Sequence, residues 1–136
     1  MAIKWLAGVE RKMNSNPVYA EQYCANMESY VTKGYVRKLC PEEAEKGSKK
    51  TWYLPHFAVS NPNKPGKFRM VFDAAAKSRG VSLNDAMLTG LDLVNPLTSV
   101  LFKFREQKIE FCGDINEMFH QVLIRKEDLP AQRFLW

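Results

Sequence analysis

Asp114 has the sequence context of a metal-binding carboxylate. It follows a segment, residues 108–113, in which Ile109 and Phe111 alternate with polar residues, a pattern that favours a β-strand. The residues after it favour the start of a helix. A carboxylate at the end of a buried strand is solvent-accessible on a rigid backbone, which suits the binding of a divalent cation. We therefore predict a metal site at Asp114.

The same residues also fit a purely structural role for Asp114. An aspartate at the N-cap with Glu117 three residues later makes a capping box, which stabilises a short helix by about 0.5 to 2 kcal/mol. The local sequence leaves both interpretations open.

The second candidate group is a cluster of cations between residues 46 and 79. This stretch contains eight lysines and arginines and one acid, Asp73, and aromatic residues are interleaved with them. Clustered cations among aromatic rings are typical of phosphate and nucleic-acid contacts, although a solvated basic surface gives the same composition. Within the cluster, Lys64, Lys67 and Arg69 surround a predicted hairpin turn, so three cations can converge on one anion.

The composition limits the class of protein. The chain has 136 residues, 46% of them apolar, and a net charge of +5, enough for one compact unit or part of a larger one. Its three cysteines lack CxxC spacing, and His56 and His120 lack metal-ligand spacing, so we predict no disulfide framework or zinc site. No segment is long and apolar enough for a signal peptide or a membrane span. We expect a soluble, intracellular, cytoplasmic protein.

Local patterns predict an α+β fold. Apolar periodicity predicts helices at 2–13, 17–33 and 96–104, with Asn16 as a cap and Gly34 as a stop. Ser82 is expected to cap a short helix, and residues 127–130 to form a helical turn. Alternation and turn residues predict strands at 35–39, 52–59, 68–73 and 108–113. Residues 133–136 begin an apolar strand with no closing signal, so the chain is expected to be cut at its C-terminus.

The chain resembles the reverse transcriptase domain of the BEL/Pao class of long-terminal-repeat retrotransposon polyproteins. The resemblance covers roughly residues 50 to 136. It is carried, in order, by YLPH at 53–56, NPNKPGKFRMVFDAAAK at 61–77, GVSLND at 80–85, DINEMFHQV at 114–122 and RFLW at 133–136. It implies a helical segment and connector at 1–50 and the fingers and early palm of the polymerase at 51–136, truncated at the C-terminus.

The resemblance also implies roles for individual residues. Asp114 matches the first of the family's catalytic metal-binding aspartates, with the Ile115 carbonyl as a further ligand for Mg²⁺ or Mn²⁺. Phe119 matches the steric gate that excludes a ribose 2′ hydroxyl. The expected nucleotide-binding residues are Lys64, Lys67, Arg69, Ile115, Glu117, Met118 and Phe119. The implied partners are an RNA or DNA template-primer, deoxynucleoside triphosphates and the remainder of the polyprotein, with virus-like particles in the cytoplasm as the location.

The family's Tyr-x-Asp-Asp turn, which carries its other two catalytic carboxylates, is absent from this sequence. Oxygen cages for divalent cations need several carboxylates or phosphates. We therefore predict that this chain alone does not polymerise DNA, although the family is one of RNA-directed DNA polymerases. Two alternatives stay open: a non-catalytic nucleic-acid-binding remnant of the polyprotein, and a relic with no stable fold.

Overall fold

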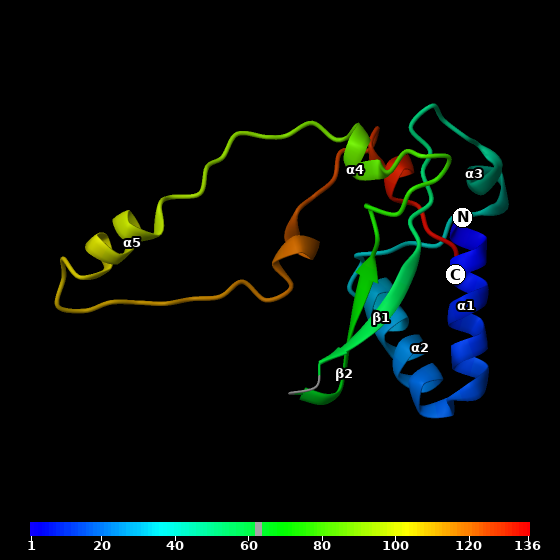
Figure 1. Cartoon of the computed structure of the whole chain (residues 1–136), viewed down its shortest axis with the longest axis horizontal. Helices are drawn as coiled ribbons and strands as arrows, with labels where there is room; N and C mark the ends of the chain where they lie inside the picture. The colour runs from blue at the N-terminus through cyan, green and yellow to red at the C-terminus, as the bar shows by residue number, and fades with distance from the viewer. Residues whose placement is uncertain (62–63) are drawn as a thin grey trace. The chain divides into compact units, whose positions relative to one another are not determined.

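The computed structural model describes residues 1–61 and 64–136, and side chains are described outside residues 61–67. The chain forms two compact units (Figure 1). The first contains residues 1–87 and 124–136, and the second contains residues 88–123. The predicted boundary at residue 50 lies inside the first unit, and the division into polymerase segments stays a prediction. The mixture of helices and a small sheet agrees with the predicted α+β class.

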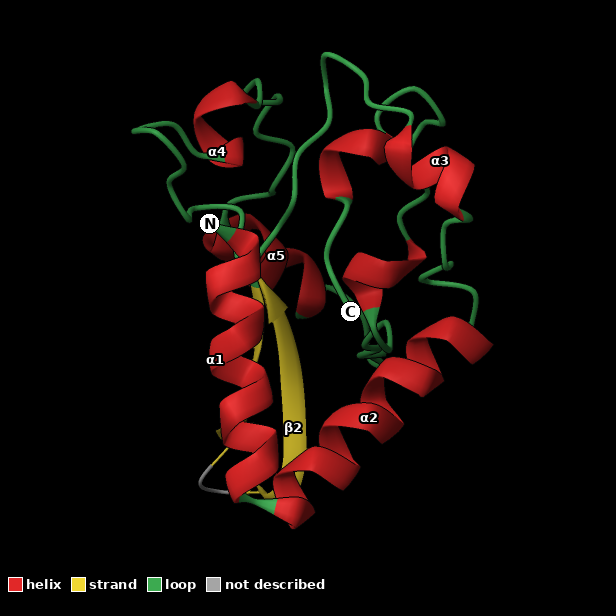
Figure 2. Cartoon of the chain, turned by 90° about the vertical axis from the view of Figure 1, so that its right-hand side faces the viewer, coloured by secondary structure: helices red, strands yellow, loops and turns green. Residues whose placement is uncertain are grey.

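The two helices predicted from apolar periodicity at the N-terminus are confirmed. Helix α1 spans Ala2–Ser15 and α2 spans Pro17–Thr32, and Figure 2 shows them meeting at one end. Between them Asn16 is extended, and its side-chain oxygen accepts a hydrogen bond from the Tyr19 N–H at 3.0 Å. This cap, with Pro17 at the first helical position, fixes where α2 begins.

Helix α2 ends at the predicted glycine. Gly34 has a φ of +74°, and hydrogen bonds run from the Gly34 N–H to the Val31 carbonyl and from the Tyr35 N–H to the Tyr30 carbonyl. This is a Schellman motif, which needs a left-handed residue at the position of Gly34. The strand predicted at 35–39 does not form, because this segment pairs with no other strand in the described part of the chain.

A β-hairpin forms at the predicted place. Strand β1 (His56–Asn61) pairs antiparallel with β2 (Lys64–Phe72), with Val59 opposite Arg69 and a register shift at Ser60/Asn61. The predicted strand at 52–59 begins late. The residues before His56 form no strand: Tyr53 makes an isolated bridge with Arg133, and the N–H groups of Trp52 and Leu54 donate to the carbonyls of Pro130 and Arg133. Residues 62 and 63, part of the predicted turn, lie outside the described residues.

One core joins the helices to the hairpin. Helix α1 contacts β1, and α2 contacts β2. The fully buried side chains of the core are Tyr23 and Met27, and around them pack the other members of the buried cluster, Val9, Tyr19 and Met70. Phe68 and Phe72 pack against the same cluster, as their alternation with Arg69 predicted.

The C-terminal segment completes this core. Phe134 lies 4.9 Å from Phe72, and Trp136 stacks on Tyr23 at 5.4 Å, both between ring centroids. The strand predicted at 133–136 is wrong, since only Arg133 makes a bridge. The segment is held by side-chain packing and not by a ladder of backbone hydrogen bonds.

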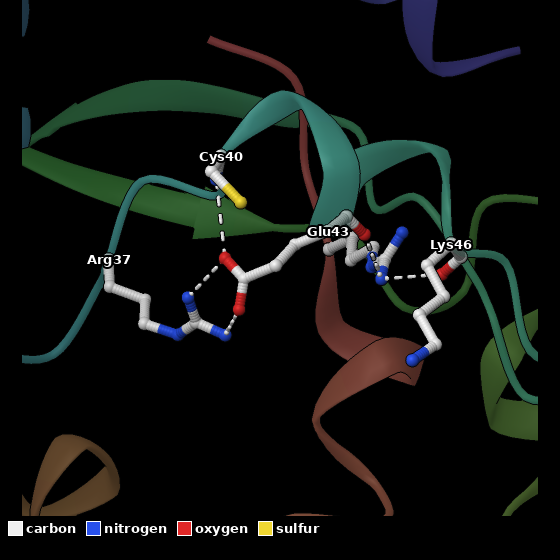
Figure 3. Close-up of polar contacts among 5 residues, drawn as sticks. Arg37, Cys40, Glu43 and Lys46 are labelled. Carbon is white, nitrogen blue, oxygen red and sulfur yellow. Dashed lines mark hydrogen bonds and ion pairs between the residues drawn. The ribbon is translucent and has the colours of Figure 1, made fainter.

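A short helix in the connector is organised by ionic contacts (Figure 3). Helix α3 spans Pro41–Glu45, and the Glu43 carboxylate accepts two hydrogen bonds from the Arg37 guanidinium, at 2.8 and 2.9 Å, and one from the Cys40 N–H. These bonds lower the pKa of Glu43 to about 2. The Arg133 guanidinium donates to three carbonyls at the end of α3, those of Glu43, Ala44 and Lys46.

The remaining short helices of the first unit follow the sequence closely. Helix α4 spans Leu83–Ala86, and its capping box pairs the Ser82 hydroxyl with the Asp85 N–H at 3.2 Å and the Asp85 carboxylate with the Ser82 N–H at 2.9 Å. The 3₁₀-helix η2 spans Leu129–Gln132, at the predicted helical turn. A capping box depends only on residues three positions apart, so the sequence predicts where α4 begins without distant contacts.

The second unit contains helix α5, Leu97–Phe104, and the 3₁₀-helix η1, Met118–Gln121. The predicted strand at 108–113 is wrong: these residues are irregular, and Ile109 and Phe111 are exposed. A strand needs a neighbour to accept and donate its backbone hydrogen bonds, and the described residues of this unit supply none. No described helix is long and apolar enough to cross a bilayer.

Candidate functional site

Of the three cations predicted to bind nucleotide, Lys64, Lys67 and Arg69, the structure describes the side chain of Arg69. It lies in β2 opposite Val59 and is exposed, whereas its neighbour Met70 points into the core. Successive strand residues face opposite sides of a sheet, so the burial of Met70 directs the guanidinium outward. Lys64 and Lys67 belong to the same strand, but their side chains lie outside the described part of the chain. Their convergence with Arg69 on one anion stays a prediction.

Asp73, the acid of the basic stretch, has a local structural role. Its carboxylate accepts hydrogen bonds from the N–H groups of Ala75 and Ala76, at 2.9 and 3.1 Å. This is the turn-forming pattern typical of aspartate. The described hydrogen bonds therefore assign Asp73 to the turn that follows β2.

Asp114 is exposed, but it does not stand at a strand end. It lies in an irregular stretch of the second unit. The capping interpretation is also wrong, because the residue before η1 is Glu117, with a φ of +52°. Asp114 is three residues before that position and makes no cap there. The structure leaves its carboxylate open to solvent on a segment without regular hydrogen bonding.

The residues after Asp114 are exposed as well. The exposed fraction is 61% for Ile115 and 84% for Phe119, and Met118 is also exposed. Glu117 is half-buried and adopts a left-handed backbone conformation, which places a bend directly before η1. A helical element does begin at Met118, but it is the four-residue 3₁₀-helix η1 and not an α-helix, and phosphate binding by the backbone at Glu117 and Met118 stays a prediction.

The described residues do not by themselves form a metal centre. Among them there is no group of three or more histidine, cysteine, aspartate or glutamate residues placed to hold a metal ion. Asp114 and the Ile115 carbonyl supply fewer oxygens than a Mg²⁺ site needs, because Mg²⁺ takes about six ligands, usually including substrate phosphates and water. Any metal bound at Asp114 thus requires ligands from elsewhere.

A groove in the first unit was not predicted from the sequence. Its lining includes Lys4, Trp5, Gly8 and Lys12 from α1 and Phe57 from β1. A signal was present, because Lys4, Gly8 and Lys12 are spaced by four residues and therefore lie on one face of a helix. The apolar stripe at Ile3, Leu6, Val9 and Met13 predicted helix α1. It did not predict that the adjacent helix face would line a groove.

Comparisons with protein families, with curated proteins and with solved structures give no match to this chain.

Proposed function

We propose that this chain is the fingers and early palm part of a reverse transcriptase of the BEL/Pao class. The observation that carries the proposal is an exposed arginine on an antiparallel hairpin, placed by the motif that resembles the family's nucleotide-binding fingers. The mixed helical and two-stranded architecture is compatible with it. The complete protein would act in the cytoplasm, within virus-like particles.

In this proposal the hairpin holds the incoming triphosphate. The Arg69 guanidinium presents a planar fork of donors that matches two phosphate oxygens at once, and the lysines act as point charges. Lys67 and Lys64 assist from the same strand. The register of β1 and β2 holds the backbone of Arg69 in place, since the core anchors both strands through Met70 and its neighbours.

Asp114 is proposed as one carboxylate of the catalytic set of the complete polymerase. Mg²⁺ or Mn²⁺ would supply charge neutralisation of the phosphates there. Because the sequence contains no Tyr-x-Asp-Asp turn to supply the other two carboxylates, the chain alone is expected to be inactive. The remaining carboxylates would come from the rest of the polyprotein.

The residues after Asp114 are proposed to contact the nucleotide sugar. The Phe119 ring, with 84% of its surface exposed, is available to exclude a ribose 2′ hydroxyl by contact. The backbone at Ile115, Glu117 and Met118 would line the same pocket. This assignment follows the motif and requires the bend at Glu117 to be kept.

A primer-extension assay tests the proposal. In the complete polymerase, Asp114→Asn is expected to lower Mg²⁺-dependent nucleotide incorporation on the order of 100-fold or more, because a charge at the reacting phosphate is lost. The matched control is Asp92→Asn, since Asp92 is an exposed carboxylate of the same unit that only accepts a hydrogen bond from the Val94 N–H. The control should retain activity.

Three results would contradict the proposal or one of its parts. Equal incorporation by the Asp114→Asn variant and the parent would remove Asp114 from catalysis. Binding of template-primer without any incorporation by the complete protein would favour the non-catalytic nucleic-acid-binding alternative. Robust incorporation by the isolated chain would refute the expected need for further carboxylates.

A further inference from the structure

The groove on α1 has a volume of about 480 Å³ and is built from the first unit alone. Helix α1 forms one wall, and Phe57 and Ala58 of β1 form another. Its described lining does not include Arg69 of the proposed triphosphate site. The groove is broad and open to solvent, which suits a ligand that passes along it.

An aromatic pair stands in this groove. The rings of Trp5 and Phe57 stack with centroids 5.7 Å apart and planes 28° from parallel. The Trp5 side chain keeps 42% of its surface exposed although it packs against Phe57. An indole anchored on one side and open on the other offers a flat apolar surface on which a planar group can stack.

Two cations flank the aromatic pair. Lys4 and Lys12 are both exposed, and eight residues of α-helix separate them by about 12 Å along the axis. The Lys12 ammonium lies 4.2 Å from the centre of the Tyr19 ring, which holds it against the wall of the groove. The described lining contains these two lysines and no acid. The groove therefore attracts anions along its length.

Gly8 keeps the middle of the groove open. It lies between the two lysines on the same helix face, and a Cβ added there would meet no atom within 4 Å. Glycine inside a helix costs about 0.5–1 kcal/mol relative to alanine. No described side chain fills the space above Gly8, so a ligand can occupy it.

We propose that this groove binds single-stranded nucleic acid, with a base stacked on Trp5 and backbone phosphates paired with Lys4 and Lys12. Alternating planar and anionic groups match the aromatic pair and its flanking cations. An acidic peptide would satisfy the lysines but would leave the indole surface unused. A free mononucleotide carries its base and phosphates at one place, whereas the cations stand about 12 Å apart.

Fluorescence anisotropy with the full chain and a labelled oligothymidylate of about 12 nucleotides tests the proposal. Trp5→Ala is expected to weaken binding by about tenfold or more, because base stacking on an aromatic ring is lost. A second variant, Trp5→Leu, keeps apolar packing on Phe57 and should show the same loss. Thermal unfolding of each variant verifies that the first unit is still folded.

The groove itself is tested by a matched pair of substitutions. Gly8→Leu places a side chain in the open space and should abolish binding, whereas Ala7→Leu adds a leucine to an exposed residue of α1 outside the lining and should not. Lys4→Gln with Lys12→Gln should lower the slope of log affinity against log salt by about 1.4, since each phosphate contact contributes about 0.7. Arg11→Gln, outside the lining, should leave that slope unchanged.

Several outcomes would overturn this site. They are equal binding by the Gly8→Leu and Ala7→Leu variants, displacement of the oligonucleotide by polyglutamate at equal charge concentration, or binding of thymidine triphosphate as tight as that of the oligonucleotide. The inference is independent of the polymerase proposal. Trp5→Ala is tested by oligonucleotide binding to the full chain and Asp114→Asn by nucleotide incorporation in the complete polymerase, so the failure of either proposal can be recognised separately.

Discussion

His56 is held in one tautomer by partners from two distant parts of the chain. It is buried, its Nε2 lies 2.7 Å from the Leu135 carbonyl oxygen, and its Nδ1 is hydrogen-bonded to the Tyr23 hydroxyl. A carbonyl only accepts, so Nε2 carries the proton and Nδ1 accepts from the hydroxyl. Burial lowers the pKa of His56, with the bond to Leu135 opposing this effect, so the ring is neutral in the folded core.

This arrangement predicts a loss of stability in mild acid. Because the folded pKa lies below the unfolded value, the unfolded chain binds more protons as the pH falls below about 6.5. The free energy of unfolding should therefore decrease from about pH 7.5 to pH 5.5, as measured by urea denaturation. His56→Gln should remove most of this dependence, and His120→Gln, at an exposed position, should preserve it. Equal dependence in both variants would contradict the assignment.

The left-handed conformation of Gly34 stabilises the C-terminal end of helix α2. Gly34→Ala is expected to lower the free energy of unfolding by about 1–2 kcal/mol, because a side chain is unfavourable at a φ of +74°. No nearby atom would obstruct the new Cβ, so the cost is conformational. Gly47→Ala is the control, since Gly47 has equal space without a positive φ, and its effect on the urea midpoint should be small.

Local signals predicted the hairpin and every helix of the described residues except α3, which was not expected, because the residues that define these elements are neighbours in sequence. Asn16 with Pro17, Ser82 with Asp85, and Gly34 each fix an end without help from distant segments. The strands predicted at 35–39, 108–113 and 133–136 failed for the opposite reason. Alternating or apolar residues permit a strand, but a ladder forms only where another strand is available.

In the candidate sites too, local features were predictable from the sequence and long-range contacts were not. The outward direction of Arg69 followed from alternation with Met70, which is a local property of a strand. The groove at Trp5 depends on Phe57, more than 50 residues away in sequence. The partners of His56, Tyr23 and Leu135, lie 33 and 79 residues away. Such contacts are set by packing and leave no pattern within a short window of sequence.

At the scale of the whole molecule, the second unit exposes much of its apolar surface. The exposed fraction is 97% for Leu88, 90% for Phe111 and 95% for Leu123. Large apolar side chains exposed to this degree favour packing against a partner. This agrees with the proposal that residues 88–123 belong to a palm whose further strands come from the rest of the polyprotein.

The proposed function requires that, in the complete polymerase, Arg69 and Asp114 contact the same nucleotide; in this chain they belong to different compact units. Exposed Cys112, two residues from Asp114, provides one labelling site, and Val59→Cys, directly opposite Arg69, provides the other. Cys24→Ser and Cys40→Ser remove the remaining thiols of this chain.

The deciding measurement is the distribution of distances between spin labels at these two positions in the complete polymerase. We predict that a deoxynucleoside triphosphate with template-primer narrows the distribution to one short distance, and that Arg69→Gln prevents this narrowing. A distribution that nucleotide leaves unchanged, under conditions in which the enzyme is saturated, would contradict the claim.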